Sequence, residues 1–339
     1  MRASSCLAGI AFLIFSCKKS DNNTINNPLP ADVNIRFLST NISDGLETVF
    51  FTSAGTGFVG GYKGGIYKTI DSGRTWTPLN STVDLPIYSL FFLNDQKGFA
   101  VGGEDFCSGS GCTPPGSFIL QTLNGGQTWK KVYNPTGNIE LKSVYFVNAS
   151  TGYCAGGNTI IKTSDGGQTW NEYKVNDLGG LLTQIVFTDP QKGYIASHSK
   201  IVETTDGGIS WKVTSTQRNI GYVAISSADG VIYVAGQHKM IKSTNDGALW
   251  NELPNSPFDI YALHFIDNKK GFAFGSGNWS GGDFGHPYGA IYYTTDGGKV
   301  WSGSEDVKET GTILAASFPT GNLGYAVSGL NKIIRIKVN

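Results

Sequence analysis

The sequence has little charge, few histidines and no apolar segment of membrane-spanning length. Its 339 residues include 26 basic and 26 acidic side chains, so the formal net charge is zero, and only 15% of the residues are charged. This balance excludes a strong field that would attract nucleic acid or an anionic membrane surface, and we expect no nucleic-acid partner. No stretch repeats its apolar residues at helical spacing. The 46 glycines and the many aromatic and β-branched residues instead predict an all-β protein with tight turns.

The N-terminal apolar run, LAGIAFLIF at 7–15, is too short to cross a bilayer as a helix and is typical of a signal-peptide core. Its last residues and the next two, Ile-Phe-Ser-Cys ending at Cys17, resemble a bacterial lipobox. The resemblance implies a signal peptide at 1–16, a lipid on Cys17 and a flexible tether at 17–32. It also implies an exported lipoprotein of the outer membrane or cell surface that contacts the membrane only through its lipid anchor. An ordinary signal peptide cut at another site is the alternative.

The remaining cysteines agree with export. Cys107 and Cys112 enclose Ser-Gly-Ser-Gly, a spacing that would close a small disulfide loop in an oxidising compartment. Cys154 lies in a predicted strand and is expected to be a buried small apolar residue. A cysteine pair without two further ligands makes a poor zinc site, so we predict neither a metal nor a cofactor.

An eight-residue box that ends in tryptophan occurs six times. The most regular copy is TSDGGQTW, and the Asp or Asn at its third position is expected to accept a backbone N–H two residues on, in an Asx turn. The Trp is expected to pack between neighbouring sheets. Calcium binding is the alternative, but each box brings only one or two carboxylates where calcium takes about six to eight oxygens. The boxes lie at 69–76, 122–129, 163–170, 204–211, 243–250 and 294–301.

The spacing of the box tryptophans predicts a propeller. Successive spacings are 53, 41, 41, 39 and 51 residues, and a period near 40 with four strands per unit is typical of a propeller blade. Three predicted strands between 312 and 338 are followed by no box, and we expect the strand at 33–39 to complete their sheet. The prediction is a seven-bladed β-propeller of four-stranded antiparallel blades over 33–339, closed by its N-terminal strand and monomeric. Six or eight blades are the alternatives.

The box resembles the Asp-box (BNR) repeat of the sialidase-like β-propeller superfamily. The phrases KGFAVGG (97–103) and GYCAGG (152–157), together with the box, are similar to propellers of the photosystem II stability/assembly factor family. This resemblance covers about residues 33–339. It implies a protein that assists membrane-complex assembly by binding other proteins, without established catalysis.

Two insertions interrupt the repeat. In a four-stranded blade the boxes are turns between the third and fourth strands, so they lie on the face opposite the loops between the second and third strands. The long tryptophan spacings place insertions in two such 2–3 loops, at 104–117 and 277–289, and binding is expected on that face. Aromatic side chains there are candidates for contacting sugar rings or an apolar anchor of a partner, and packing over the blade edge is the alternative. The candidates are Asp105, Phe106, Trp279, Asp283, Phe284, His286 and Tyr288.

Several further polar residues are predicted on the same face. His198, His238 and His286 fall in the 2–3 loops of three successive blades, which makes a metal triad an alternative, but neighbouring blades are too splayed for these loops to converge. Arg218 also falls there and would meet an anionic partner. His264 lies in a predicted inner strand and is expected to be a satisfied core residue.

Two classes of function follow from these features. The first is a membrane-tethered, non-catalytic binding or scaffold propeller that recognises a protein or glycan through the face carrying 104–117 and 277–289. The second is a sialidase-like or xyloglucanase-like glycoside hydrolase acting on extracellular polysaccharide. Sialidases hold their substrate with three arginines, whereas the arginines here are scattered, and we predict no catalytic residue. The scattered arginines are Arg36, Arg74, Arg218 and Arg335, and the carboxylates open to a hydrolase would be Glu104, Asp105 and Asp283.

Overall fold

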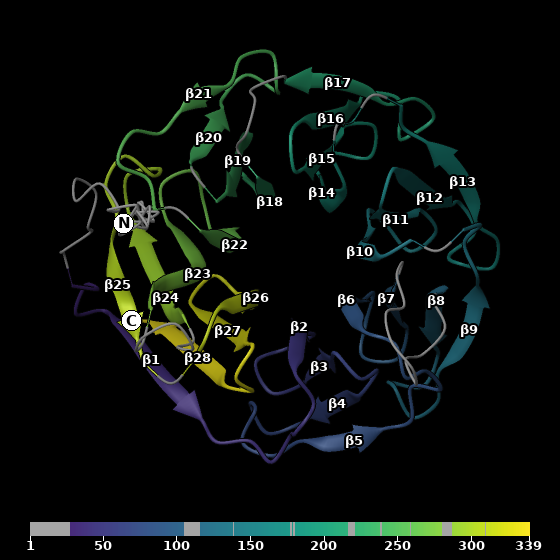
Figure 1. Ribbon diagram of the computed structural model, residues 1–339, viewed down its shortest axis with the longest axis horizontal. Helices are drawn as coiled ribbons and strands as arrows, with labels where there is room; N and C mark the ends of the chain where they lie inside the picture. The colour runs from purple at the N-terminus through teal and green to yellow at the C-terminus, as the bar shows by residue number, and fades with distance from the viewer. Residues whose placement is uncertain are drawn as a thin grey trace, which may run out of the picture.

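The chain forms a ring of seven four-stranded antiparallel sheets around a central opening (Figure 1). The predicted seven-bladed all-β propeller is therefore confirmed. The computed structural model describes residues 28–104, 116–137, 139–176, 178, 180–215, 221–237, 239–257, 259–279, 287–308 and 310–339. Within these ranges no helix has the length and apolar character needed to cross a membrane.

Blades 1 to 6 each consist of four consecutive strands that follow one another from the opening outward. The first three blades contain β2 (Leu46–Phe51), β3 (Gly57–Gly61), β4 (Ile66–Thr69), β5 (Thr77–Leu79), β6 (Ile87–Phe92), β7 (Gly98–Glu104), β8 (Gly116–Thr122), β9 (Lys130–Tyr133), β10 (Leu141–Phe146), β11 (Gly152–Gly156), β12 (Thr159–Thr163) and β13 (Asn171–Lys174). The next three contain β14 (Leu182–Phe187), β15 (Gly193–Ser197), β16 (Ile201–Thr204), β17 (Lys212–Ser215), β18 (Tyr222–Ala228), β19 (Val231–Gly236), β20 (Met240–Ser243), β21 (Asn251–Glu252), β22 (Ile260–Phe265), β23 (Gly271–Trp279), β24 (Pro287–Thr294) and β25 (Ser302–Val307).

The seventh blade combines both ends of the chain. It contains β26 (Ile313–Thr320), β27 (Leu323–Ser328) and β28 (Ile333–Val338), with β1 (Val33–Leu38) as its outermost strand. β1 pairs with β28 along its whole length, so the predicted closure by the N-terminal strand is confirmed. Arg36 and Arg335 are register partners in this pair, as expected for residues of the last blade. Leu29, near the end of the predicted tether, packs against the apolar cluster shared by blades 6 and 7.

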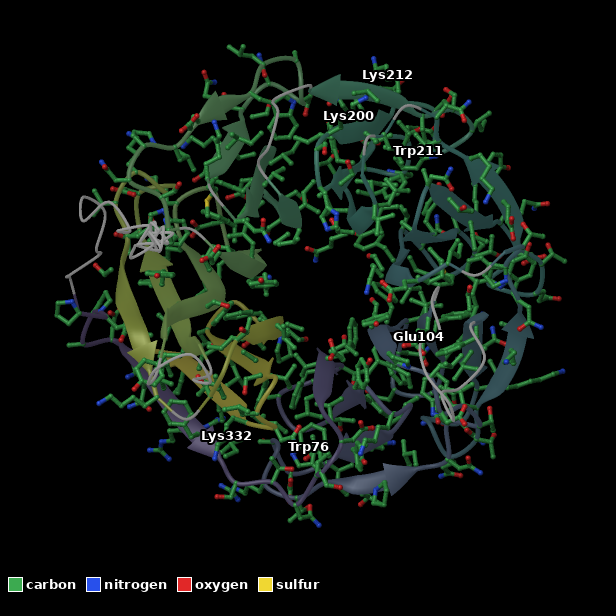
Figure 2. All side chains as sticks on the ribbon, viewed as in Figure 1. Trp76, Glu104, Lys200, Trp211, Lys212 and Lys332 are labelled. Carbon is green, nitrogen blue, oxygen red and sulfur yellow. The ribbon has the colours of Figure 1, made fainter. Side chains whose placement is uncertain are left out.

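Neighbouring blades are joined by a repeated aromatic stack. The sixth residue of the inner strand is Phe in six of the seven blades, and it stacks on an aromatic ring in the second strand of the preceding blade. Phe187, for example, lies 4.5 Å from Tyr153 between ring centroids, and Trp211 meets it edge-on at 6.1 Å. The box tryptophans therefore pack between sheets, as predicted, and Trp76 and Trp211 lie well away from the central opening (Figure 2). Cys154 is fully buried in this interior, also as predicted.

Each box is a turn held by its own side chains. In the third blade the Asp165 carboxylate accepts the N–H groups of Gln168 and Thr169 at 2.9 Å each, and the Thr169 hydroxyl at 2.6 Å. The accepted N–H groups are thus three and four residues on, and not two as predicted, because the two glycines lengthen the turn. These hydrogen bonds hold the pKa of Asp165 well below its usual range. Since both carboxylate oxygens already accept internal bonds, the geometry favours the turn interpretation over calcium.

The boxes also bond to the preceding blade. Lys162, in the third strand of blade 3, donates to the carbonyl of Gly207 in the blade 4 box at 2.7 Å, and the Tyr153 hydroxyl donates to the same carbonyl at 2.6 Å. Lys68 and Lys242 make the equivalent bond to the next box, each at 2.9 Å. The box is therefore a stabilising element both within and between blades.

Replacing Thr163 by valine should test the box hydrogen bonds. Thr163 is fully buried, and its hydroxyl accepts the N–H of Gly167 at 2.8 Å while donating to Asp165 at 2.8 Å. Valine keeps the shape but leaves that N–H without a partner, so we expect the free energy of unfolding to fall by about 1–3 kcal/mol in urea denaturation. Thr77→Val, at an exposed position of β5, is the matched control. Equal effects of both changes would contradict the assigned role of the hydroxyl.

All seven inner strands contain the same β-bulge between their first and third residues. A bulge re-aims the extra residue, and here the second residue of each strand faces the central opening. The fifth residues of several inner strands, among them Phe50, Phe91 and Tyr145, also line the opening. At these two positions the inner strands thus present side chains to the channel and not to a neighbouring sheet. The bulges turn a variable side chain from every blade toward one channel.

Candidate functional site

Both insertions lie at the end of the opening where the inner strands begin. The Gly103 N–H, before the first insertion, donates to the carbonyl of Pro86 at 3.1 Å, next to the start of β6. The Ser276 N–H, before the second, donates to the carbonyl of Asp259 at 3.0 Å, next to the start of β22. We call this end of the propeller, with its 2–3 loops and interblade connections, the mouth face. The insertions do fall between second and third strands, as predicted.

Strand structure extends into both ends of each predicted insertion. β7 continues through Glu104 and β8 begins at Gly116, while β23 continues to Trp279 and β24 begins at Pro287. The ends of 104–117 and 277–289 are therefore paired strand, because hydrogen bonding between second and third strands continues past the body of the blade. Tyr288 is accordingly a half-buried strand residue of β24.

Most of the predicted site residues lie outside the described residues. Of Trp279 only the backbone is described, at the end of β23, and His198 is exposed in the 2–3 loop of blade 4. The described residues contain no group of three or more metal-ligating side chains. The predicted residues that lie outside the described ones are Cys17, Asp105, Phe106, Cys107, Cys112, Arg218, His238, Asp283, Phe284 and His286.

A ring of seven side chains surrounds the opening at the mouth face. It consists of the second residue of each inner strand, turned inward by the bulge, and all seven are partly exposed. We call this set the mouth ring. Its members are Glu47, Tyr88, Lys142, Thr183, Val223, Tyr261 and Leu314. The structure thus brings together one side chain from every blade. These side chains occupy equivalent positions but differ in chemistry.

Lys142 is held by two neighbours. Its ammonium lies 2.7 Å from a carboxylate oxygen of Glu140 and 3.4 Å from the centroid of the Tyr88 ring. The Tyr88 hydroxyl in turn donates to the other oxygen of Glu140 at 3.4 Å. Burial and the charge of Glu140 raise the pKa of Tyr88, so this phenol stays neutral. The three residues form a closed group in which an ammonium is bound by one carboxylate and one aromatic face.

Glu47, unlike Lys142, has no described residue of opposite charge in contact with it. It is half-buried on β2, and among the described residues no hydrogen bond or ion pair involves its carboxyl. Burial raises its pKa to about 7; the charge of Lys142 opposes this rise, and the charges of Asp44 and Glu140 add to it. Asp44 itself uses both carboxylate oxygens to accept the N–H groups of Lys63 and Gly65, at 2.7 and 2.9 Å. Glu47 is therefore a carboxyl directed into space that a ligand can occupy.

The mouth ring encloses a cavity of about 350 Å³, with Glu140, Leu181, Leu182 and His198 completing its wall. Desolvation, and then the charge of Lys142, lower the pKa of His198, which keeps its ring neutral at pH 7. The channel also holds a cavity of about 470 Å³, whose lining includes the mouth ring and the fifth residues of several inner strands. His264 belongs to this lining and lies flat on Phe318 at 4.3 Å between ring centroids. It faces the channel and is not a satisfied core residue, which corrects the prediction.

The comparisons with known proteins agree with this architecture. A family model described as photosynthesis system II assembly factor YCF48 matches residues 175–321. The solved structure of YCF48 bound to D1 peptide is 17% identical, covers 93% of this chain and 100% of its own, and has a TM-score of 0.69. The chain is a propeller similar to YCF48. The structure of YCF48 from Cyanidioschyzon merolae is 14% identical and covers 89% of this chain and 98% of its own, with a TM-score of 0.68.

Enzymes share the same fold. The structure of the GH74 enzyme from Niastella koreensis is 17% identical, covers 88% of this chain but only 53% of its own, and has a TM-score of 0.66. At these identities the solved structures show the fold alone, so function has to be argued from the site. A comparison with curated proteins found no significant match.

Sequence reasoning did not find the mouth ring. Its seven positions share no residue type, and the bulge that turns them inward leaves no motif of its own. One signal was present: several second strands end in a glycine that lies opposite the first residue of the inner strand, as Gly156 does opposite Leu141. A Cβ at Gly156 would lie 2.0 Å from the carbonyl oxygen of Glu140, so only glycine fits there.

Proposed function

We propose that this chain is a non-catalytic binding propeller that recognises a protein partner across its mouth face. The proposal includes a lipid anchor on Cys17 that holds the propeller near a membrane of the cell envelope. A glycan is the alternative ligand for the same surface.

The mouth ring is the observation that carries this proposal. Equivalent positions that serve the fold repeat their residue, as the six stacked phenylalanines do. The mouth ring instead presents an acid, a lysine, a hydroxyl, two tyrosines and two aliphatic side chains to solvent. Tyrosine with mixed polar and apolar groups is typical of surfaces that bind proteins. One similar solved structure is that of YCF48 bound to D1 peptide, which supports a peptide ligand for this kind of propeller.

Peptide selection would test the partner surface. Peptides displayed on phage are selected on the full chain, and the selected peptides are then measured against variants by titration calorimetry. We expect Leu314→Arg, which places a long cation in the mouth ring, to weaken binding at least about tenfold, as loss of a central contact does at protein interfaces. Ile209→Arg is the matched control, because Ile209 is 70% exposed on a box at the opposite face.

Three results would distinguish the possibilities. Retained binding by Leu314→Arg together with loss in Ile209→Arg would place the partner on the box face and contradict the proposal. A chain with Trp279, Phe284 and Tyr288 changed to Ala should also bind more weakly if the second insertion contacts the partner. Specific signals on a glycan array, without any peptide selected, would favour the glycan alternative.

A glycoside hydrolase is the second candidate, and one observation favours it. Glu47 and Glu140 line the same cavity in different environments, one unpaired with a raised pKa of about 7 and one paired with Lys142. Glycosidases use two carboxyl groups whose environments differ in this way. Under our proposal, chromogenic glycosides should not be hydrolysed above the rate of buffer. Hydrolysis that disappears in both Glu47→Gln and Glu140→Gln would establish the enzyme instead.

A further inference from the structure

We propose that the mouth cavity binds an ammonium group on an alkyl chain, such as a lysine side chain of the partner, with Glu47 as its counter-ion. This inference rests on the proposed function, since it names the chemistry by which the mouth face recognises a protein. The site is formed by Glu47 together with the apolar and aromatic members of the mouth ring.

In the described part of the chain, the carboxyl of Glu47 has no partner. Every other acidic group near it is already paired: Asp44 accepts two backbone N–H groups and Glu140 is bonded to Lys142. Glu47 alone, among the described residues that line the cavity, has a carboxyl without a hydrogen bond or ion pair. A half-buried carboxylate without a partner is costly, and an incoming cation would remove that cost.

The wall of the cavity already binds one ammonium, that of Lys142. The Lys142 ammonium sits against the Tyr88 ring and the Glu140 carboxylate, at 3.4 and 2.7 Å. This arrangement of aromatic face and carboxylate is the one that proteins use for alkylammonium ligands. Glu47 and Tyr261 line the same cavity on either side of Leu314, so the wall also provides a carboxyl and an aromatic ring that no ion pair or ring contact among the described residues joins to a lysine.

The charges and the apolar wall of the cavity also suit an alkylammonium group. Lys142 is the one basic side chain that lines it, since the pKa of His198 is lowered and that ring is neutral at pH 7. The two glutamates therefore leave the cavity negative once Glu47 ionises. Leu181, Val223 and Leu314 provide apolar wall, and about 350 Å³ accommodates the four-carbon stem of a lysine.

Binding should depend on pH through Glu47. Because its pKa is about 7, the Glu47 carboxyl is mostly protonated below pH 7 when no ligand is bound. An ammonium ligand binds the ionised form. About nine-tenths of the carboxyl is ionised at pH 8 and about one-tenth at pH 6, so the apparent affinity should fall about tenfold between these values. The lysine ammonium remains charged throughout this range. Tyr88 and Tyr261, both with raised pKa values, also do not titrate in it.

A pair of short peptides would test the site on the full chain. Acetyl-Gly-Lys-Gly-amide and its norleucine counterpart differ only in the ammonium, and their binding is measured by NMR titration at pH 6, 7 and 8. We expect the lysine peptide to bind about tenfold more tightly at pH 8 and the preference to disappear at pH 6. Glu47→Gln should abolish the preference at every pH, while Glu252→Gln, on the outer strand of blade 5, should retain it.

The outcomes separate this inference from the proposed function. Equal binding of both peptides, or a lysine preference that survives Glu47→Gln, would overturn the ammonium site even if selected peptides still require Leu314. An arginine peptide that binds as tightly as the lysine one would overturn the assignment to an alkylammonium. If Glu47→Gln fails to fold, the two peptides on the unchanged chain decide, since equal binding of both at pH 8 excludes the ammonium site.

Discussion

Replacing Phe187 by alanine should lower the free energy of unfolding by about 4 kcal/mol, the usual cost of removing a large buried ring. Phe187 is 6% exposed and lies between blades 3 and 4, stacked on Tyr153 and met edge-on by Trp211. It also covers Gly193, where a Cβ would lie 2.6 Å from the ring, so no neighbouring side chain can refill the space. Urea denaturation followed by tryptophan fluorescence would measure the loss.

Phe37 provides the matched control for this substitution. It lies on the outermost strand β1 and is 53% exposed, so Phe37→Ala should change stability by less than about 1 kcal/mol. Blade 5 shows that the ring tolerates one missing stack, since Ser227 stands where the other blades have Phe. Comparable losses in Phe187→Ala and Phe37→Ala would show that the interblade stacks are not what holds the ring together.

Gly156→Ala should destabilise the chain by about 3 kcal/mol. Its Cβ would lie 2.0 Å from the carbonyl oxygen of Glu140 and 2.8 Å from the Cα of Leu141, and both contacts are with backbone. The start of β10 would have to move, and Glu140 and Lys142 would move with it. Urea denaturation would measure the loss of stability.

Gly116→Ala is the control for this second substitution. Gly116 begins β8 near the first insertion, and the nearest atom to its added Cβ is in the Leu85 side chain at 3.8 Å, an ordinary van der Waals contact. Its stability should change by less than about 1 kcal/mol. A Gly156→Ala chain with unchanged stability would mean that the bulge does not depend on glycine.

The architecture could be predicted because the fold repeats its chemistry. The box needs an acceptor side chain, glycines and a large apolar ring in fixed order, and six copies at a spacing near 40 residues define the blades. The closure could be predicted because three C-terminal strands without a box require a fourth, and β1 was the one strand without a blade. The orientation of the insertions followed from the place of the box turns between third and fourth strands.

The candidate site could not be predicted in the same way because it lies where the repeat varies. Glu47, Tyr88 and Lys142 occupy one equivalent position, yet nothing in their identities relates them until the bulge aligns them. Lys142 and Glu140 belong to blade 3 and Tyr88 to blade 2, so their contact depends on how far apart the two blades stand around the ring. His264 was assigned to the core since inner strands are mostly apolar, whereas the fifth position of such a strand faces the channel.

The pairing of β1 with β28 sets the order in which the ring can be completed. The first strand of the propeller in sequence order pairs with its last, and the partners Val33 and Val338 stand about 300 residues apart. Six blades can each form from local segments as they emerge, but β1 must wait, unpaired, until β28 has been made. Closure is therefore a late step that involves both ends of the chain, and a ring truncated before β28 would retain an open edge.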